Sequence, residues 1–281
     1  MVTVEKSKDI LFSLEYCVLS KFIELVSNLL PLPPQIIKFK KPNNGILKFN
    51  PTKTFPLLKS GDFFISGTLP ILKYLINSAK DDSDGVILDN RKILIGKNLK
   101  EEAKVEMWTN FIFTSIYPIT FEIEGQLYGK KKFNSEIFNY AVNDLMEALK
   151  PVNEELTFNA FLTSNNIRLP DLMLVSVLFK CYNDILTKEK MEKIPNVIRM
   201  FKFVSHMRNF VDIFGEAIPC EKQKEPEIFV ECKEEELEKS KKNDKKDKKN
   251  KELQKESEKD PNKEKEKDKE KGKKKKNKKN K

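Results

Sequence analysis

The sequence predicts a small α/β unit, an all-helical unit and a disordered lysine-rich tail, in that order along the chain. Residues 10–65 hold short apolar runs separated by turn residues, whereas residues 100–186 carry apolar side chains at helical spacing over longer runs. Residues 233–281 contain 23 Lys, 14 Asp or Glu and no Arg, which gives this segment a net charge of +9. A segment so rich in charge buries too little apolar surface to offset the entropy of ordering the chain.

The α/β unit is expected within residues 1–80, in the order β-α-β-loop-β-β-α. Apolar runs predict strands at 10–14, 35–39, 55–58 and 62–65. Apolar side chains at i, i+3 and i+4 predict helices at 18–26 and 68–77. Ser60-Gly61 marks the turn of an antiparallel hairpin, and Pro31 begins a proline cluster that ends the first helix.

The all-helical unit is expected within residues 81–225, after a polar linker at 81–85. Helical spacing predicts helices at 100–113, 136–149, 172–186 and 195–207, and a short helix near Phe210. The 172–186 segment is apolar on nearly every face, which is typical of a central buried helix. The tail is assigned to residues 226–281.

The chain shows no sign of secretion or of a membrane span. Glu5, Asp9 and Glu15 interrupt the N-terminal region, so a signal peptide is not expected. The most apolar window, 169–179, is far too short to cross a bilayer. The four cysteines fit neither a zinc motif nor a disulfide framework: Cys17, Cys181, Cys220 and Cys232. We therefore expect a cytoplasmic protein with reduced thiols and no membrane partner.

No metal site and no cofactor is expected. His206 is the only histidine, and no Asp or Cys stands near it at a useful spacing. The Gly-Lys pairs at 96–97 and 129–130 lack the preceding glycine of a phosphate-binding loop.

Three short motifs resemble the glutathione-transferase-like fold. Thr54-Phe55-Pro56-Leu57 matches the turn before that fold's cis-proline, and Ile65-Ser66-Gly67-Thr68 stands where the fold places a glutamate–serine pair. Asp171 stands at the start of the predicted buried helix, where the fold keeps a capping aspartate. The resemblance implies a thioredoxin-like N-terminal half and an all-α C-terminal half.

A closer resemblance lies in the C-terminal half. Residues 193–201 (KIPNVIRMF) and 210–222 (FVDIFGEAIPCEK) are similar to the gamma subunit of translation elongation factor 1. Tyr117-Pro118-Ile119 also resembles that family's helix-ending proline. The similarity covers residues 95–223, with residues 9–80 related by fold alone. The family continues through a lysine-rich linker into a second domain, which is expected to be absent here.

The resemblance raises the question of transferase chemistry, which needs an activated hydroxyl or thiol at the end of the first strand. Ser13, Tyr16 and Cys17 are the candidates, and all three can equally be turn or helix-face residues. Ser66 could bond the γ-glutamyl end of glutathione, but Ile65 before it cannot accept a hydrogen bond through its side chain. We therefore predict no catalytic residue and no enzyme activity. The vestigial glutathione-site positions would be Ser13, Phe55, Pro56 and Ser66.

Asp171 is predicted to be a structural cap that accepts backbone N–H bonds at the start of the buried helix. The hydroxyl partner that a complete capping box needs three residues earlier is replaced by Arg168. Only half of that motif is therefore expected.

The end of the tail is a candidate for weak, nonspecific contact with tRNA or ribosomal RNA. Its lysines can neutralise phosphates, and the absence of Arg argues against reading of bases. The alternative is a solvated linker without a ligand. The candidate RNA contacts are Lys273, Lys274, Lys275, Lys276, Lys278 and Lys279.

Three functions remain open at this point. The first is a non-catalytic scaffold of the elongation factor 1 exchange complex, whose domain binds an exchange-factor subunit or another glutathione-transferase-like translation protein. The second is an assembly module of an aminoacyl-tRNA synthetase complex with a tRNA-holding tail. The third is a divergent glutathione transferase. A dimer is compatible with all three.

Overall fold

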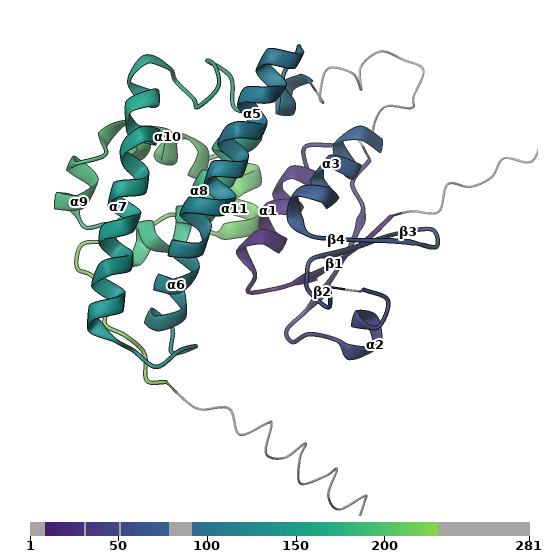
Figure 1. The fold of residues 1–281 in the computed structure, drawn as a ribbon, viewed down its shortest axis with the longest axis horizontal. Helices are drawn as coiled ribbons and strands as arrows, with labels where there is room; N and C mark the ends of the chain where they lie inside the picture. Colours follow the sequence, from purple (N-terminus) through teal and green to yellow (C-terminus); the bar gives the residue numbers. More distant parts are fainter. Residues whose placement is uncertain (1–8, 31, 51, 79–91, 230–281) are drawn as a thin grey trace, which may run out of the picture. The chain divides into compact units, whose positions relative to one another are not determined.

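The computed structural model describes residues 9–30, 32–50, 52–78 and 92–229. In the N-terminal half they form a sheet of four strands in the order β2-β1-β3-β4. The strands are β1 (Ile10–Leu14), β2 (Gln35–Phe39), β3 (Leu57–Ser60) and β4 (Phe63–Ser66). Leu11 of β1 lies opposite Ile36 in parallel β2 and opposite Leu58 in antiparallel β3. Helices α1 (Val18–Ser27) and α3 (Thr68–Ser78) cover one face of the sheet, and the short α2 (Asn44–Leu47) lies on the other side (Figure 1).

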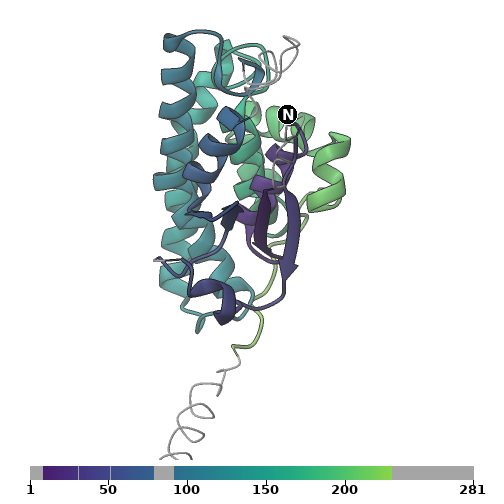
Figure 2. The same ribbon diagram turned by 90° about the vertical axis from the view of Figure 1, so that its right-hand side faces the viewer.

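The central strands are buried on both faces, as their continuous apolar runs require. Leu11 and Phe12 in β1 are buried, as are Leu57 and Leu58 in β3. α1 adds a fully buried Phe22 to the same core. The long helices of the C-terminal half lie behind the strands in the view of Figure 2.

The strands predicted at 10–14 and 35–39 are confirmed. The hairpin is also confirmed, but Ser60 pairs with Phe63, so its turn is Gly61-Asp62 rather than Ser60-Gly61. Gly61 has φ 57, the left-handed conformation that favours glycine. The sequence did not predict α2, because four residues are too few to show a helical period.

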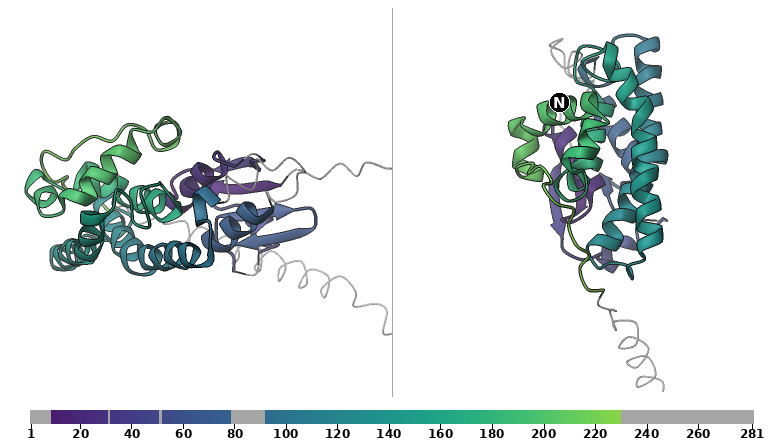
Figure 3. Two further views of the ribbon diagram at one scale, coloured as in Figure 1. Left: turned by 90° about the horizontal axis from the view of Figure 1, so that it is seen from above. Right: turned by 90° about the vertical axis from the view of Figure 1, so that its left-hand side faces the viewer.

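The C-terminal half is helical, and seen from above it lies beside the sheet half (Figure 3). Its elements are α5 (Leu99–Phe111), the π-helical segment η1 (Ile112–Ile116), α6 (Tyr117–Leu127), α7 (Ser135–Phe158), α8 (Leu169–Asp184), α9 (Lys188–Glu192), α10 (Pro195–Ser205) and α11 (Arg208–Phe214). The predicted helices are all present, and α8 is buried along nearly its whole length. It packs against α1, so the two halves share one apolar core.

Pro118 does not end a helix, although the resemblance implies that it does, and a second proline, Pro151, lies inside a helix. Pro118 lies in the first turn of α6, which continues directly from η1. Because proline has no N–H for the α-helical ladder, the preceding turn is wider, and the Tyr117 N–H donates to the carbonyl of Ile112. α7 continues through Pro151. That proline is exposed, so water can reach the carbonyl that its ring leaves without a donor.

Residues 215–229 form an extended segment that we call the C-terminal strap. Its backbone N–H groups donate to carbonyls of the preceding helices: Cys220 to Tyr182 at 3.2 Å, Lys224 to Asp184 at 2.8 Å and Glu227 to Leu127 at 2.9 Å. The strap thereby runs from the end of α8 to the end of α6, and it includes residues 226–229, which the sequence analysis assigns to the tail.

The described residues belong to one compact unit. None of the helices in the described part of the chain is long and apolar enough to span a membrane. The predicted linker at 81–85, Cys232 and the six tail lysines proposed as RNA contacts lie outside the described residues.

Candidate functional site

Ser13 is fully buried and bonded inside the N-terminal half. Its hydroxyl donates to Glu24 Oε1 at 2.7 Å, and the same carboxylate pairs through Oε2 with Lys38 Nζ at 2.7 Å. Glu24 on α1 is itself only 3 % exposed, so its charge, which would be costly to bury alone, is neutralised by Lys38 and hydrogen-bonded by Ser13. Ser13 therefore links the sheet to α1 and is not presented to a substrate.

The two other candidate nucleophiles stand just after β1. Tyr16 is 68 % exposed and lies on the surface. Cys17 is half-buried at the N-cap of α1, and its side chain makes no capping hydrogen bond. Tyr117, whose pKa burial raises to about 12, lies close enough for Cys17 and Glu124 to add to that shift. Of the three candidate positions, Ser13 is committed to a buried carboxylate, whereas Tyr16 is exposed and Cys17 is half-buried.

Polar side chains fill the region around the Phe55–Pro56 peptide, which is cis. Asn50, only 1 % exposed, donates through Nδ2 to the Thr54 carbonyl at 2.6 Å and accepts from the Thr52 hydroxyl at 2.8 Å. Thr52 Oγ1 lies 3.0 Å from Ser66 Oγ. The Ser66 hydroxyl, the predicted γ-glutamyl contact, is thus already engaged by a neighbouring hydroxyl.

The start of α3 offers little else to hold an ammonium or carboxylate group. Ser66 ends β4, Gly67 follows with φ 92, and Thr68 begins the helix with a side chain only 3 % exposed. Ile65 packs against the apolar core. These positions supply no acidic side chain to pair with the ligand's ammonium group.

A groove of about 610 Å³ lies between α3 and α5. Its floor is apolar and comes from both helices and the start of α8: Leu69, Leu72, Ile76, Val105, Met107 and Leu169. Met107 lines this groove and is 55 % exposed, so its apolar side chain is accessible to a partner. Lys73 on α3 and Glu106 on α5 stand at its margins.

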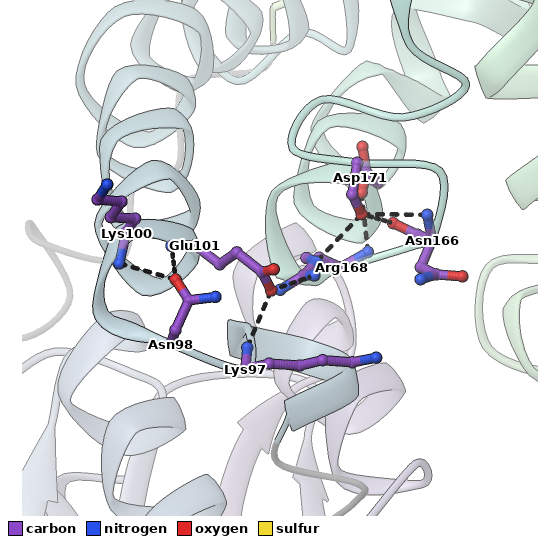
Figure 4. A network of polar contacts seen from close by, with 8 residues as sticks. Lys97, Asn98, Lys100, Glu101, Asn166, Arg168 and Asp171 are labelled. Atoms are coloured by element: carbon purple, nitrogen blue, oxygen red, sulfur yellow. Dashed lines mark hydrogen bonds and ion pairs between the residues drawn. The ribbon is translucent and has the colours of Figure 1, made fainter.

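The buried carboxylate of Asp171 caps the start of α8 (Figure 4). Its Oδ2 accepts from the Arg168 N–H and its Oδ1 from the Leu162 N–H, both at 2.8 Å. Burial raises the pKa of Asp171 to about 6, against the opposing effect of these N–H donors. Through these two bonds the carboxyl group ties the loop before α8 to the helix.

Arg168 stands where a complete capping box has a hydroxyl side chain, and it forms an ion pair instead of a cap. A guanidinium cannot accept a hydrogen bond, so it cannot cap the helix itself. Instead its Nη2 lies 2.7 Å from Glu101 Oε2 at the start of α5, and its Nε donates to Ser164 Oγ at 3.2 Å. Its buried Nη1 has no partner. Gly96 (φ 108) leaves the space, because a Cβ there would lie 2.7 Å from that nitrogen.

His206 lies on the surface at the end of α10, with Nδ1 2.6 Å from the Lys202 carbonyl. Within the described residues no cluster of His, Cys, Asp and Glu could hold a metal ion.

The sequence analysis did not identify three residues of these sites, which are Glu24, Asn50 and Met107. Glu24 could have been recognised as a buried charge, because it is a carboxylate inside the apolar run Phe22-Ile23-Glu24-Leu25-Val26.

No family model matches the chain. Among curated proteins it is similar to probable elongation factor 1-gamma 1 of Arabidopsis thaliana, with 27% identity over 180 residues, or 62% of this chain and 41% of that protein. The chain spans about two fifths of the length of the elongation factor 1-gamma proteins from Arabidopsis and rice that it matches. The chain is thus similar to the gamma subunits of elongation factor 1, as its residues 193–222 indicate.

Other relatives carry different names. A glutathione S-transferase-like protein of Gibberella fujikuroi is 24% identical over 131 residues, or 47% of this chain and 62% of that protein. A valine–tRNA ligase of Takifugu rubripes is 23% identical over 125 residues, or 44% of this chain and 10% of that protein.

Solved structures confirm the fold. The glutathione-transferase-like domain of elongation factor 1-gamma from Saccharomyces cerevisiae superposes with a TM-score of 0.66 at 17% identity, covering 79% of this chain and 99% of that one. Poplar glutathione transferase F1 gives a TM-score of 0.62 at 15% identity, covering 74% and 96%. The fold is the glutathione-transferase-like one that the sequence predicts.

Proposed function

We propose that this chain is a non-catalytic assembly subunit of the translation elongation factor 1 exchange complex. Its glutathione-transferase-like domain binds an exchange-factor subunit in the cytoplasm. The similarity to elongation factor 1-gamma supports the choice of complex. The observation that carries the non-catalytic role is the burial of Ser13 against Glu24, because a hydroxyl committed to a buried carboxylate cannot serve as a nucleophile.

The surface that we assign to the exchange-factor subunit is the groove between α3 and α5. An apolar floor with charges at its margin is the arrangement that accepts one face of an amphipathic helix. Lys73 and Glu106 stand at that margin, and neither makes an ion pair among the described residues. They would favour a helix whose flanks carry charges of both signs, and Met107 would be its central apolar contact.

The test is a binding titration of the full-length chain with the purified exchange-factor subunit. Met107→Asp should weaken binding by about tenfold or more, because it would bury an unpaired charge in an apolar contact. Asn139→Asp, which adds the same charge on the exposed face of α7, should leave binding unchanged. If the wild-type chain binds no exchange-factor subunit, the proposed function is wrong.

The titration also separates two readings of the groove. If Met107→Asp binds the exchange-factor subunit as well as the wild type does, the groove is not the contact surface. Light scattering of the chain alone would then show whether the groove joins two copies, since Met107→Asp would convert a dimer into monomers.

A second candidate function is assembly into an aminoacyl-tRNA synthetase complex. The similarity to part of a valine–tRNA ligase favours it. The same chain would then bind a synthetase and no exchange-factor subunit, and parallel titrations with both classes of partner decide between the two. In either complex the lysine-rich tail would supply weak, nonspecific contact with RNA.

A further inference from the structure

The turn between α6 and α7 places three consecutive lysines on the surface in a fixed conformation. Lys130, Lys131 and Lys132 are exposed. The backbone N–H groups of Lys130 and Lys131 both donate to the Gly125 carbonyl, at 3.0 and 2.9 Å. On the far side, Asn134 donates its N–H to Gln126 Oε1 at 2.9 Å and caps α7. The three ammonium groups are therefore carried by an ordered turn.

Two aromatic rings accompany these lysines. Phe121 on α6 is 52 % exposed, with Lys131 Nζ 5.9 Å from its ring centroid. Phe133 follows directly in the chain and is 39 % exposed. Exposed rings beside lysines are the combination with which proteins bind single-stranded nucleic acid, since bases stack on the rings and phosphates meet the charges.

The nearby carboxylates are largely occupied. Glu122 pairs with Lys131, and Glu227 pairs with Lys224 at 2.8 Å. Lys130 and Lys132 have no ion pair among the described residues. Glu136, an exposed carboxylate in the first turn of α7, reduces the positive charge of the turn but does not cancel it.

The C-terminal strap ends at the same turn. Glu227 bonds to Leu127, and Gly129 (φ 59) lies so close to the strap that a Cβ there would be 2.8 Å from the Ile228 carbonyl oxygen. The last described residues therefore lie at the lower end of α6 and α7 (Figure 1). In the sequence, the first lysine of the lysine-rich segment follows four residues after Phe229.

We propose that the α6–α7 turn binds single-stranded RNA, with Lys130 and Lys132 on phosphates and Phe133 under a base. This site is distinct from the groove and does not depend on the proposed exchange-factor partner. It gives the folded domain its own nucleic-acid contact, which tail charge alone does not supply.

The test compares full-length variants by fluorescence anisotropy with a labelled single-stranded oligoribonucleotide of mixed sequence. Lys130→Ala/Lys132→Ala should lower the slope of log affinity against log salt by about 1.4, since each single-strand phosphate contact contributes about 0.7. The matched control, Lys104→Ala/Lys202→Ala, removes two exposed charges on α5 and α10 and should leave the slope unchanged. Equal slopes for both double variants would overturn the proposal.

Phe133→Leu tests the stacking. It keeps an apolar side chain against Phe138, whose ring centroid lies 5.5 Å from that of Phe133. The variant should bind the single strand about fivefold or more weakly and the matching RNA duplex equally well. Photo-crosslinking of a thiouridine-containing strand should label residues 130–137. Crosslinks confined to residues beyond 229 would contradict a nucleic-acid site on this turn. A competition with poly-glutamate, which carries charge but no bases, gives a second check. If it displaces the RNA equally well from the wild type and from Phe133→Leu, the turn does not bind bases.

Discussion

Arg168 Nη2 lies 2.7 Å from Glu101 Oε2 although 67 residues separate the two in sequence. The pair joins the first turns of α5 and α8, and the Lys97 N–H donates to the same carboxylate oxygen at 2.9 Å. The side chain of Arg168 is only 4 % exposed, whereas that of Glu101 is 33 % exposed. The loss of Glu101 would therefore leave a buried cation without its counter-ion.

This pair predicts a specific acid sensitivity. The Lys97 N–H and the Arg168 guanidinium hold the pKa of Glu101 below its ordinary value of 4.5. A carboxyl group whose pKa is lower in the folded state stabilises the fold above its unfolded pKa, and this stabilisation is lost as the pH falls through the folded pKa. Glu101→Gln should thus have a lower melting temperature than the wild type at neutral pH. The difference in melting temperature between the two proteins should become smaller below about pH 4. Glu154→Gln on exposed α7 is the control, and an equal pH profile for both variants would contradict the assignment.

Asp171→Ala should destabilise the fold by about 2–4 kcal/mol, because two buried backbone N–H groups lose their acceptor. Chemical unfolding monitored by the fluorescence of Trp108 measures this. Asp144→Ala, at an exposed position of α7, should change the free energy of unfolding by less than about 0.5 kcal/mol. If Asp171→Ala lowers the free energy of unfolding by less than about 1 kcal/mol, water replaces the carboxylate as acceptor for the two N–H groups.

Arg199→Ala should loosen the end of α7. The Arg199 Nη2 donates to the carbonyls of Leu156 and Asn159, at 2.8 and 3.1 Å, and its charge lies at the negative end of the helix. We expect a loss of about 1–2 kcal/mol in the free energy of unfolding. Lys202→Ala, on the same helix and exposed, should have little effect. Hydrogen exchange at residues 153–158 should accelerate in the arginine variant alone.

The purified chain should not conjugate glutathione to chlorodinitrobenzene faster than the reaction in solution. Ser13→Ala should leave this result unchanged while destabilising the fold by about 1–2 kcal/mol, because the buried Glu24 carboxylate loses its hydroxyl partner and keeps only the half-exposed Lys38. Turnover that survives Ser13→Ala but disappears in Cys17→Ala would contradict the non-catalytic proposal and assign a thiol-based transferase to the chain.

The periodic parts of the fold were predictable from sequence. The alternation in 35–39 and the all-round apolar character of 172–186 each depend on local pattern, and the structure confirms both. The α6 helix was missed, because the rule that proline ends helices ignores the π turn that accommodates Pro118.

The candidate sites were less predictable, because they depend on contacts between distant residues. Ser13 was recognised as a position, but its commitment to Glu24 requires knowing which face of α1 meets the sheet. The contact between Thr52 and Ser66 spans 14 residues and has no sequence motif. The strap's return to Leu127 similarly joins segments about one hundred residues apart, a contact that no local pattern predicts.

Strand β4 has β3 as its only neighbour among the described strands. Its sequence, Phe63-Phe64-Ile65-Ser66, is the kind that recruits a foreign strand by backbone pairing. The strand is only four residues long, and Gly67 turns the chain into α3 immediately afterwards. Short edges of this kind offer too few hydrogen bonds to nucleate an intermolecular sheet. The domain can therefore be held at high local concentration in a large assembly with little tendency to aggregate through this edge.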